Sequence, residues 1–269
     1  MKSKIPVVLT IAGSDSGGGA GIQADLRTFA FHCVHGASAL TCVTAQNTVA
    51  VNRVDGLPPQ AVVAQLDAVV DDLGVQAVKT GMLLNAEIIQ AVSDRLQTLQ
   101  LRPLVVDPVM VSRSGAQLID RQAVETLQQA LIPQATVVTP NRYEAQLLTG
   151  VEINSLEKME EAAETLKWQS GVQAVLIKGG GMTGELRGVD VLLDDQGMVV
   201  LKTECIDTGN THGTGCTLSA AIAANLATGH SIRDAVHQGK NYVTEALKWS
   251  LEIGQGTGPV GHFFPLCLN

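Results

Sequence analysis

Short apolar runs alternate with longer amphipathic segments along almost the whole chain. The apolar runs are rich in valine, isoleucine and leucine, as buried strands are. Other segments, such as residues 59–73, repeat valine and leucine at helical spacing, which predicts helices. Strands are expected at residues 7–11, 39–44, 77–79, 103–106, 136–138 and 174–177, with a hairpin formed by residues 189–193 and 199–204. Helices are expected at residues 20–31, 59–73, 85–99, 120–131, 142–148, 155–168 and 232–251, with one more ending near residue 227.

The order of these elements favours one fold class. Strand–helix–strand units build parallel sheets through right-handed crossovers, so we expect an α/β protein with a mostly parallel, doubly wound sheet and helices on both faces. The chain has no internal repeat, no low-complexity segment and no linker rich in proline or serine. We therefore expect residues 1–269 to form a single domain.

Composition narrows the range of partners and locations. Charged residues make up 16%, the net charge is −8 and there is no run of lysine or arginine, so neither nucleic acid nor an anionic membrane is an expected partner. The apolar run at residues 5–11 is too short for a signal peptide or a membrane span. The five cysteines lack CxxC spacing and are odd in number, which is typical of thiols in a reducing cytosol. A cytoplasmic location is expected.

Small and polar residues gather where the expected strands end. Ligands of open α/β sheets bind outside the carboxyl ends of the strands, so these residues should line a single cleft. They are residues 13–15, Gln46, Gly81, Met82, Asp107, Asn141, Lys178 and residues 207–216.

Residues 207–216 carry the clearest candidate chemistry. This polar loop contains three glycines and leads into an alanine-rich segment, as a loop does when it opens a buried helix. The first turn of a helix has unpaired N–H groups and the positive end of the helix dipole, and so binds phosphate readily. The alternative is an ordinary connection in which Thr211 or Thr214 caps the helix. Cys216 and Asp207 on either side of the turn favour a functional role.

Residues 19–24 suggest a competing function. They match the G-x-G-x-x-G/A fingerprint of dinucleotide-binding proteins and follow an expected strand, which would indicate an NAD-dependent oxidoreductase. That fingerprint needs an acidic residue about twenty positions further on to bind the ribose. The second expected strand instead ends in Thr-Ala-Gln-Asn, and no P-loop motif is present either. The oxidoreductase remains an outside alternative.

The motif Asn-Thr-His-Gly-Thr-Gly-Cys at residues 210–216 resembles the anion hole of ribokinase-like kinases. The variant is that of the hydroxymethylpyrimidine/phosphomethylpyrimidine kinases of thiamine biosynthesis, and the similarity extends from about Ile5 to Pro265. It implies a three-layer αβα ribokinase-like fold. The implied activity is ATP-dependent phosphorylation of 4-amino-5-hydroxymethyl-2-methylpyrimidine and then of its monophosphate to the diphosphate. The family also suggests a homodimer, and a pyridoxal or pyridoxine kinase is the nearest competing function.

The resemblance implies a pyrimidine subsite, because residues 12–26 look like the substrate-side signature of the family. By that similarity Asp25 and the backbone near Gly13 would face the pyrimidine, with Val109 also in contact. Gln46 would contact the aminopyrimidine edge, which suits a carboxamide because it donates and accepts in one plane. Met82 would pack on the ring. On the residues alone, Asp25 could be simply solvated and Met82 could fill the core.

The same resemblance implies a nucleotide side with ATP and Mg²⁺. Asp107 and Glu144 would hold the cation through water, since Mg²⁺ needs only one or two carboxylates beside phosphate oxygens. A plain alternative for Glu144 is a favourable charge in the first turn of a helix. Gly209 stands where family members commonly have lysine. The implied ATP-binding residues are Asn141, Lys178, Gly180, Thr208 and Lys240.

Catalysis is assigned by the resemblance to Gly213, Thr214, Gly215 and Cys216. Their N–H groups would stabilise charge on the phosphoryl group during transfer. Cys216 would be the base that takes the proton of the substrate hydroxymethyl group, and a thiol at a helix N-terminus is expected to have a lowered pKa. The alternative for Cys216 is a small buried apolar residue.

Overall fold

The computed structural model describes residues 5–110 and 119–267. Nine strands of this part of the chain form one sheet in the order β3-β2-β1-β4-β5-β6-β7-β8-β9. The pairs between β2 and β7 along this order are parallel, whereas β3, β8 and β9 join antiparallel. The strands are β1 (Val7–Asp15), β2 (His35–Gln46), β3 (Val51–Gly56), β4 (Ala77–Thr80), β5 (Leu104–Val106), β6 (Val137–Val138), β7 (Ala174–Ile177), β8 (Asp190–Asp194) and β9 (Gly197–Leu201).

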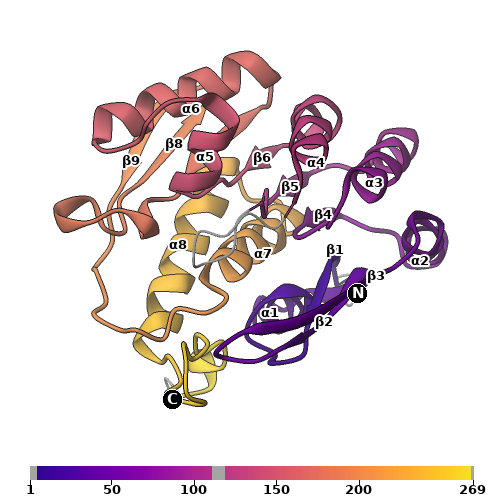
Figure 1. The fold of residues 1–269 in the computed structure, drawn as a ribbon, viewed down its shortest axis with the longest axis horizontal. Coiled ribbons are helices and arrows are strands. Elements are labelled where there is room, and N and C mark those ends of the chain that lie inside the picture. The colour runs from indigo at the N-terminus through magenta and orange to yellow at the C-terminus, as the bar shows by residue number, and fades with distance from the viewer. Residues whose placement is uncertain (1–4, 111–118, 268–269) are drawn as a thin grey trace.

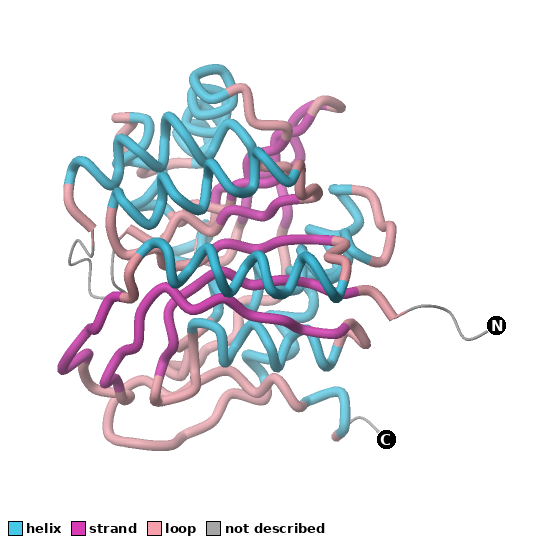
Figure 2. The backbone as a smooth tube through the Cα atoms, turned by 90° about the vertical axis from the view of Figure 1, so that its right-hand side faces the viewer, coloured by secondary structure: helices cyan, strands magenta, loops and turns pink. Residues whose placement is uncertain are grey.

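Helices cover both faces of the sheet, as Figures 1 and 2 show. One face carries α2 (Pro59–Leu73), α3 (Ala86–Leu99), α4 (Arg121–Thr126), α5 (Arg142–Thr149) and α6 (Leu156–Ser170). The other face carries α1 (Gly21–Phe31), α7 (Thr214–Ala227) and α8 (Ile232–Lys248). A π-helical turn, Leu127–Leu131, and a 3₁₀ turn, Ile132–Gln134, continue α4. The α/β, doubly wound architecture predicted from the sequence is confirmed.

Helix α7 is buried on nearly all sides, and its composition allows this. Residues from Thr217 to Asn225 are buried, and most of them are alanine or another small residue. Gly239 of α8 faces this helix, and a Cβ there would lie only 3.1 Å from Ile222. The two helices can therefore approach closely, and α7 packs against β1, β4 and β5 of the sheet.

The helix starts expected from capping residues are confirmed. The side chains of Asn85, Asp120 and Ser155 each accept a hydrogen bond from the backbone three residues on, which satisfies an N–H group of the first turn. The last expected helix, residues 232–251, ends earlier, at Lys248. Within the described residues, no helix combines the length and hydropathy that a membrane crossing requires.

Strand β3 was not predicted. All six of its residues are exposed, and it pairs only with β2, so it has no apolar face to produce an alternating pattern. Its partner β2 runs from His35 to Gln46, longer than the expected strand at residues 39–44.

Candidate functional site

The turn that opens α7 has the geometry of an anion site. Gly213 is the N-cap residue at φ +84°, and no side chain caps the helix, so the alternative in which Thr211 or Thr214 is the cap is wrong. A Cβ on Gly213 would lie 1.8 Å from the carbonyl oxygen of Gly19, so glycine is required there for both conformation and space. The Thr214 N–H donates to the Thr211 carbonyl at 3.4 Å, and no side chain caps the helix, so the first turn has no side-chain acceptor at its N-terminus.

A buried ion pair lies directly beside this turn. Lys178, after β7, donates from Nζ to Asp107 Oδ1 at 2.8 Å, and Ser219 of α7 donates to Asp107 Oδ2 at 3.1 Å. A Cβ on Gly215 would be 3.4 Å from Lys178 Nζ and 3.8 Å from Asp107 Oδ2. Burial alone would raise the pKa of Asp107, but Lys178, with Lys79 behind it, brings that pKa below its usual value. The Lys178 ammonium group therefore lies next to the turn at residues 213–216.

Glu144 joins this cluster through the start of α5. Asn141 caps the helix by accepting from the N–H of Glu144, and the Glu144 carboxylate accepts the N–H of Asn141 in return, at 2.8 Å. The alternative expected for Glu144, a first-turn role, is thus part of its structure. The pKa of Glu144 is raised to about 7, mainly by burial and also by the nearby Asp107 carboxylate, while Lys178 acts in the opposite direction.

The two carboxylates fit a cation bound mainly by a nucleotide. Among the residues that the structure describes, no group of three or more His, Cys, Asp or Glu side chains could hold a metal ion alone. Mg²⁺ needs no such cage, because it keeps water and binds phosphate oxygens with one or two carboxylates. Asp107 and Glu144 repel each other electrostatically, and a divalent cation between phosphate and these groups would relieve that repulsion.

Beneath Cys216 lies a second ion pair, which the sequence analysis did not anticipate. Lys79 of β4 donates to Asp25 Oδ2 at 2.8 Å, Thr10 donates to the same oxygen at 2.6 Å, and both charged side chains are 0% exposed. Asp25 Oδ1 has no hydrogen-bond partner within the described part of the chain. The alternative of a solvated Asp25 is therefore wrong. A lysine inside the apolar strand at residues 77–80 was the sequence signal for this pair.

The predicted lowering of the Cys216 pKa is also wrong. The thiol is half-buried, and burial raises its pKa to about 11, although the Lys79 ammonium acts in the opposite direction. The carboxylates of Asp25 and Asp107 add to the increase. Desolvation of the thiolate thus outweighs the Lys79 ammonium and the Gly21 N–H, which both favour the thiolate.

On the other side of the turn, several of the predicted pyrimidine residues come together. A Cβ on Gly13 would lie 2.9 Å from Met82 Cε and 2.7 Å from Cys42 Sγ, so the methionine lies over the bare backbone of β1. Met82 and Gln46 are both half-buried, and Gln46 Oε1 lies 3.3 Å from Thr44 Oγ1. Val109 is half-buried and donates its N–H to the carbonyl of Asp107 at 2.8 Å, which connects this side to the ion pair.

Other predicted nucleotide residues have less direct positions. Lys240 is buried, and its ammonium donates to Asp190 Oδ2 and to the Gly188 carbonyl, both at 2.6 Å. Asp190 also accepts the Gly179 N–H, so Lys240 supports the segment after β7. Thr208 Oγ1 lies 3.0 Å from Ser250 Oγ, and Gly180 is exposed. The Asp207 side chain is fully exposed, 3.9 Å from Arg187, so it does not belong to the buried cluster.

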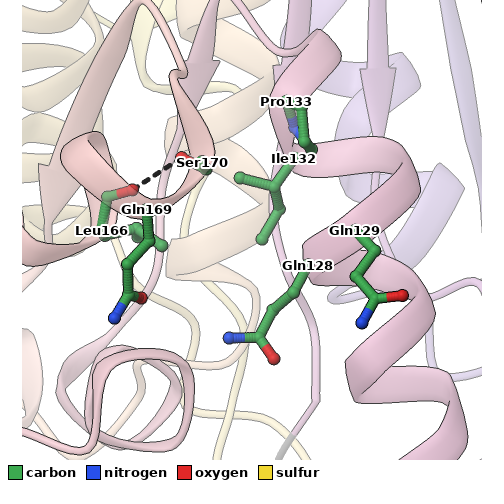
Figure 3. Close-up of a pocket in the computed structure, with 7 residues that line it drawn as sticks. All are labelled: Gln128, Gln129, Ile132, Pro133, Leu166, Gln169 and Ser170. Carbon is green, nitrogen blue, oxygen red and sulfur yellow. Dashed lines mark hydrogen bonds between the residues drawn. The ribbon is translucent and has the colours of Figure 1, made fainter.

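A shallow cavity elsewhere on the surface lacks the groups for catalysis. It lies between the π-helical turn after α4 and α6, as Figure 3 shows. Its lining residues are Gln128, Gln129, Ile132, Pro133, Leu166, Gln169 and Ser170. None of them titrates near neutral pH, so the strand ends remain the candidate site.

Comparison with known proteins agrees with this geometry. The family model for phosphomethylpyrimidine kinase matches residues 15–261. The chain is 60% identical over 262 residues to the hydroxymethylpyrimidine/phosphomethylpyrimidine kinase of Synechococcus elongatus, which covers 97% of this chain and 99% of that protein. The structure of a pyridoxal kinase from Bacillus subtilis in complex with ADP superposes with a TM-score of 0.89 at 40% identity, over 98% of this chain and 100% of that one. A phosphomethylpyrimidine kinase from Clostridium difficile gives a TM-score of 0.81 at 42% identity, over 90% and 99% of the two chains.

Proposed function

Because this chain belongs to the phosphomethylpyrimidine kinase family, we propose that it phosphorylates 4-amino-5-hydroxymethyl-2-methylpyrimidine and then its monophosphate, with ATP as donor. The observation that supports this activity most strongly is the uncapped turn at residues 213–216 beside the Lys178–Asp107 pair. A positive helix end and an ammonium group next to each other suit a phosphoryl group in transfer, because charge on its oxygens is what the protein must stabilise.

Each group of the site has a proposed role in this reaction. The N–H groups of Gly213, Thr214, Gly215 and Cys216 hold the phosphoryl oxygens, and Lys178 adds a positive charge beside them. The Cys216 thiolate takes the proton of the attacking hydroxyl. Burial opposes formation of that thiolate, whereas the Lys79 ammonium favours it, so turnover should rise with pH through the neutral range.

The nucleotide side requires ATP and a cation. The ADP complex of the similar Bacillus subtilis protein supports an adenine nucleotide here. Bound Mg²⁺ would neutralise charge on the β- and γ-phosphates, and Asp107 and Glu144 would hold it through water. We place Asn141, Gly180 and Thr208 beside the nucleotide. Lys240 acts at a distance through Asp190, which fixes the Gly179 N–H.

The pyrimidine would lie between Met82 and the strand ends. Gly13 has no side chain, which lets Met82 pack against the backbone of β1, and Gln46 offers a carboxamide to the aminopyrimidine edge. Val109 completes this side, while the buried Asp25 lies behind it. A pyridoxal-type vitamer is the second candidate substrate, favoured by the likeness to the Bacillus subtilis pyridoxal kinase, because it is also a flat heteroaromatic with a hydroxymethyl group.

A coupled assay of ADP release tests the proposal. Hydroxymethylpyrimidine, its monophosphate, pyridoxal and ribose are supplied separately with MgATP. We expect turnover with both pyrimidines, and a kcat/KM for pyridoxal that is lower by at least about tenfold. Higher kcat/KM with pyridoxal would favour the second function. Release of no ADP from any alcohol, together with binding of NAD, would favour the oxidoreductase alternative.

We also propose a homodimer in the cytoplasm. The five cysteines are free thiols, which suits a reducing compartment. The edge strand β3, its neighbour β2 and the turn between them present exposed valines that a second copy could cover: Val43, Val49, Val51 and Val54. Light scattering after size exclusion should give twice the mass of the chain, and a monomer mass at micromolar concentration would contradict the dimer.

A further inference from the structure

Asp15, the last residue of β1, is the centre of a hydrogen-bond cluster to which the reaction above assigns no role. Its buried Oδ1 accepts the Gly17 N–H at 2.8 Å, and Oδ2 accepts the N–H groups of Gly19 and Ala20 at 3.0 and 2.9 Å. One carboxylate thus fixes the glycine-rich loop at residues 16–20, next to the proposed pyrimidine subsite.

His212 brings a further donor to the same carboxylate from the other side of the site. Its Nε2 lies 2.8 Å from Asp15 Oδ2. Burial would raise the pKa of Asp15, but His212 and the backbone donors bring that pKa below its usual value, so the carboxylate is ionised and Nε2 is the donor. The backbone of His212 is held as well, because its N–H donates to the Gly258 carbonyl and its carbonyl accepts the Val260 N–H. His212 therefore joins three segments of the chain.

The two loops are also in direct backbone contact. A Cβ on Gly213 would lie 1.8 Å from the Gly19 carbonyl oxygen, and a Cβ on Gly19 would lie 2.3 Å from His212 Cδ2. Loops packed this closely cannot shift independently of each other. His212 immediately precedes the N-cap Gly213. The position of the His212 ring therefore determines the orientation of the turn at residues 213–216.

We propose that His212 and Asp15 are positioning residues that couple the glycine-rich loop of the pyrimidine side to the anion turn at residues 213–216. This inference rests on the kinase function proposed above. The pair does not contact the reacting atoms. It holds the phosphoryl-binding N–H groups in register with the substrate hydroxyl, so its loss lowers the rate of transfer more than the affinity for either substrate. A misplacement of about 1 Å costs on the order of 10²-fold in rate.

Three variants separate the hydrogen bond from the packing of the ring. His212→Leu removes the donor and keeps an apolar side chain against Gly19. His212→Gln keeps an N–H donor that can reach Asp15. His230→Leu is the matched control, since His230 is an exposed histidine whose ring lies beside Thr228 Oγ1 and the Asn225 carbonyl at the C-terminal end of α7. The kcat and both KM values are measured by ADP release, affinity for a non-hydrolysable ATP analogue by calorimetry, and folding by thermal melting.

We expect His212→Leu to lower kcat by about 10- to 100-fold with KM and analogue affinity within about threefold of wild type. His212→Gln should recover most of the loss, and His230→Leu should match wild type. Wild-type kcat in His212→Leu, or an equal loss in His212→Gln, would overturn the proposal. If His212→Leu does not fold, Asp15→Asn carries the same expectation and the same refutation. Failure of the kinase function is seen separately, as absence of ADP release in the wild-type protein.

Discussion

Gly215→Ala is expected to change stability and turnover in opposite directions. Gly215 lies in the first turn of α7 and does not adopt a positive φ, so alanine fits its backbone. The nearest atoms to the added methyl would be Lys178 Nζ at 3.4 Å and Asp107 Oδ2 at 3.8 Å, which are ordinary contacts. Because alanine is favoured over glycine inside a helix by about 1 kcal/mol, the free energy of unfolding should rise by up to that amount.

The same methyl group would stand in the space that the phosphoryl oxygens need. Blocking a donor of an anion hole typically costs 10²- to 10³-fold in kcat, or about 3–4 kcal/mol, and we expect a loss in that range. Thermal melting should show a Tm higher by about 2–4 °C, while the ADP-release assay shows the loss of turnover. Turnover within about threefold of wild type in a stabilised protein would mean that the first turn of α7 does not bind the phosphoryl group during transfer. A lower Tm would instead mean that the local packing is wrongly described.

Three further substitutions test the charged groups around the turn. Lys178→Met should lower kcat/KM for ATP by roughly 10- to 100-fold, the value of a charge-assisted hydrogen bond, and an unchanged kcat/KM would exclude a phosphate contact. The pKa of Glu144 is about 7 in the folded protein and 4.5 in the unfolded chain. Protonated Glu144 therefore contributes its full stabilisation below about pH 4.5, and this contribution is lost as the pH rises through 7. Glu144→Gln should therefore gain stability over wild type between pH 5 and pH 8 in urea melts, by up to about 3 kcal/mol, and a pH-independent difference would contradict this. Lys79→Met leaves the Asp25 carboxylate buried without its partner and should lower the free energy of unfolding by on the order of 3–5 kcal/mol. The double variant Lys79→Met/Asp25→Leu should recover much of this loss. Equal losses in the single and double variants would refute the pairing.

The sequence was sufficient for the architecture where burial is strong and local. Strands covered on both faces read as apolar runs, and helices with caps such as Asn85 and Ser155 start where their side chains predict. The start of α7 was also predictable, because a polar loop with glycines leads into an alanine-rich segment. Strand β3 escaped detection because an exposed edge strand needs no apolar pattern.

The electrostatics of the site could not be predicted from local sequence. Lys79 and Asp25 are 54 positions apart, and Lys240 and Asp190 are 50 apart, so only the folded sheet brings them together. The pKa of Cys216 depends on how much water the surrounding elements exclude, which a helix-terminus argument does not contain. The dinucleotide-like glycines at residues 19–24 were ambiguous for a related reason. A Cβ on Gly21 would lie 2.4 Å from the Gly13 carbonyl oxygen, so close backbone packing requires glycine there without any dinucleotide.

The most direct test of the account is single-turnover phosphorylation of hydroxymethylpyrimidine by Cys216→Ala, with Cys205→Ala, an exposed thiol, as the control. If the α7 turn transfers the phosphoryl group while the Cys216 thiolate takes the proton, the Cys216 variant should lose at least about 10²-fold in rate, the scale of general-base catalysis. It should keep its affinity for the pyrimidine, and the wild-type increase of rate with pH should disappear. A rate near wild type with the same pH dependence would contradict the assignment of the base at the centre of this account.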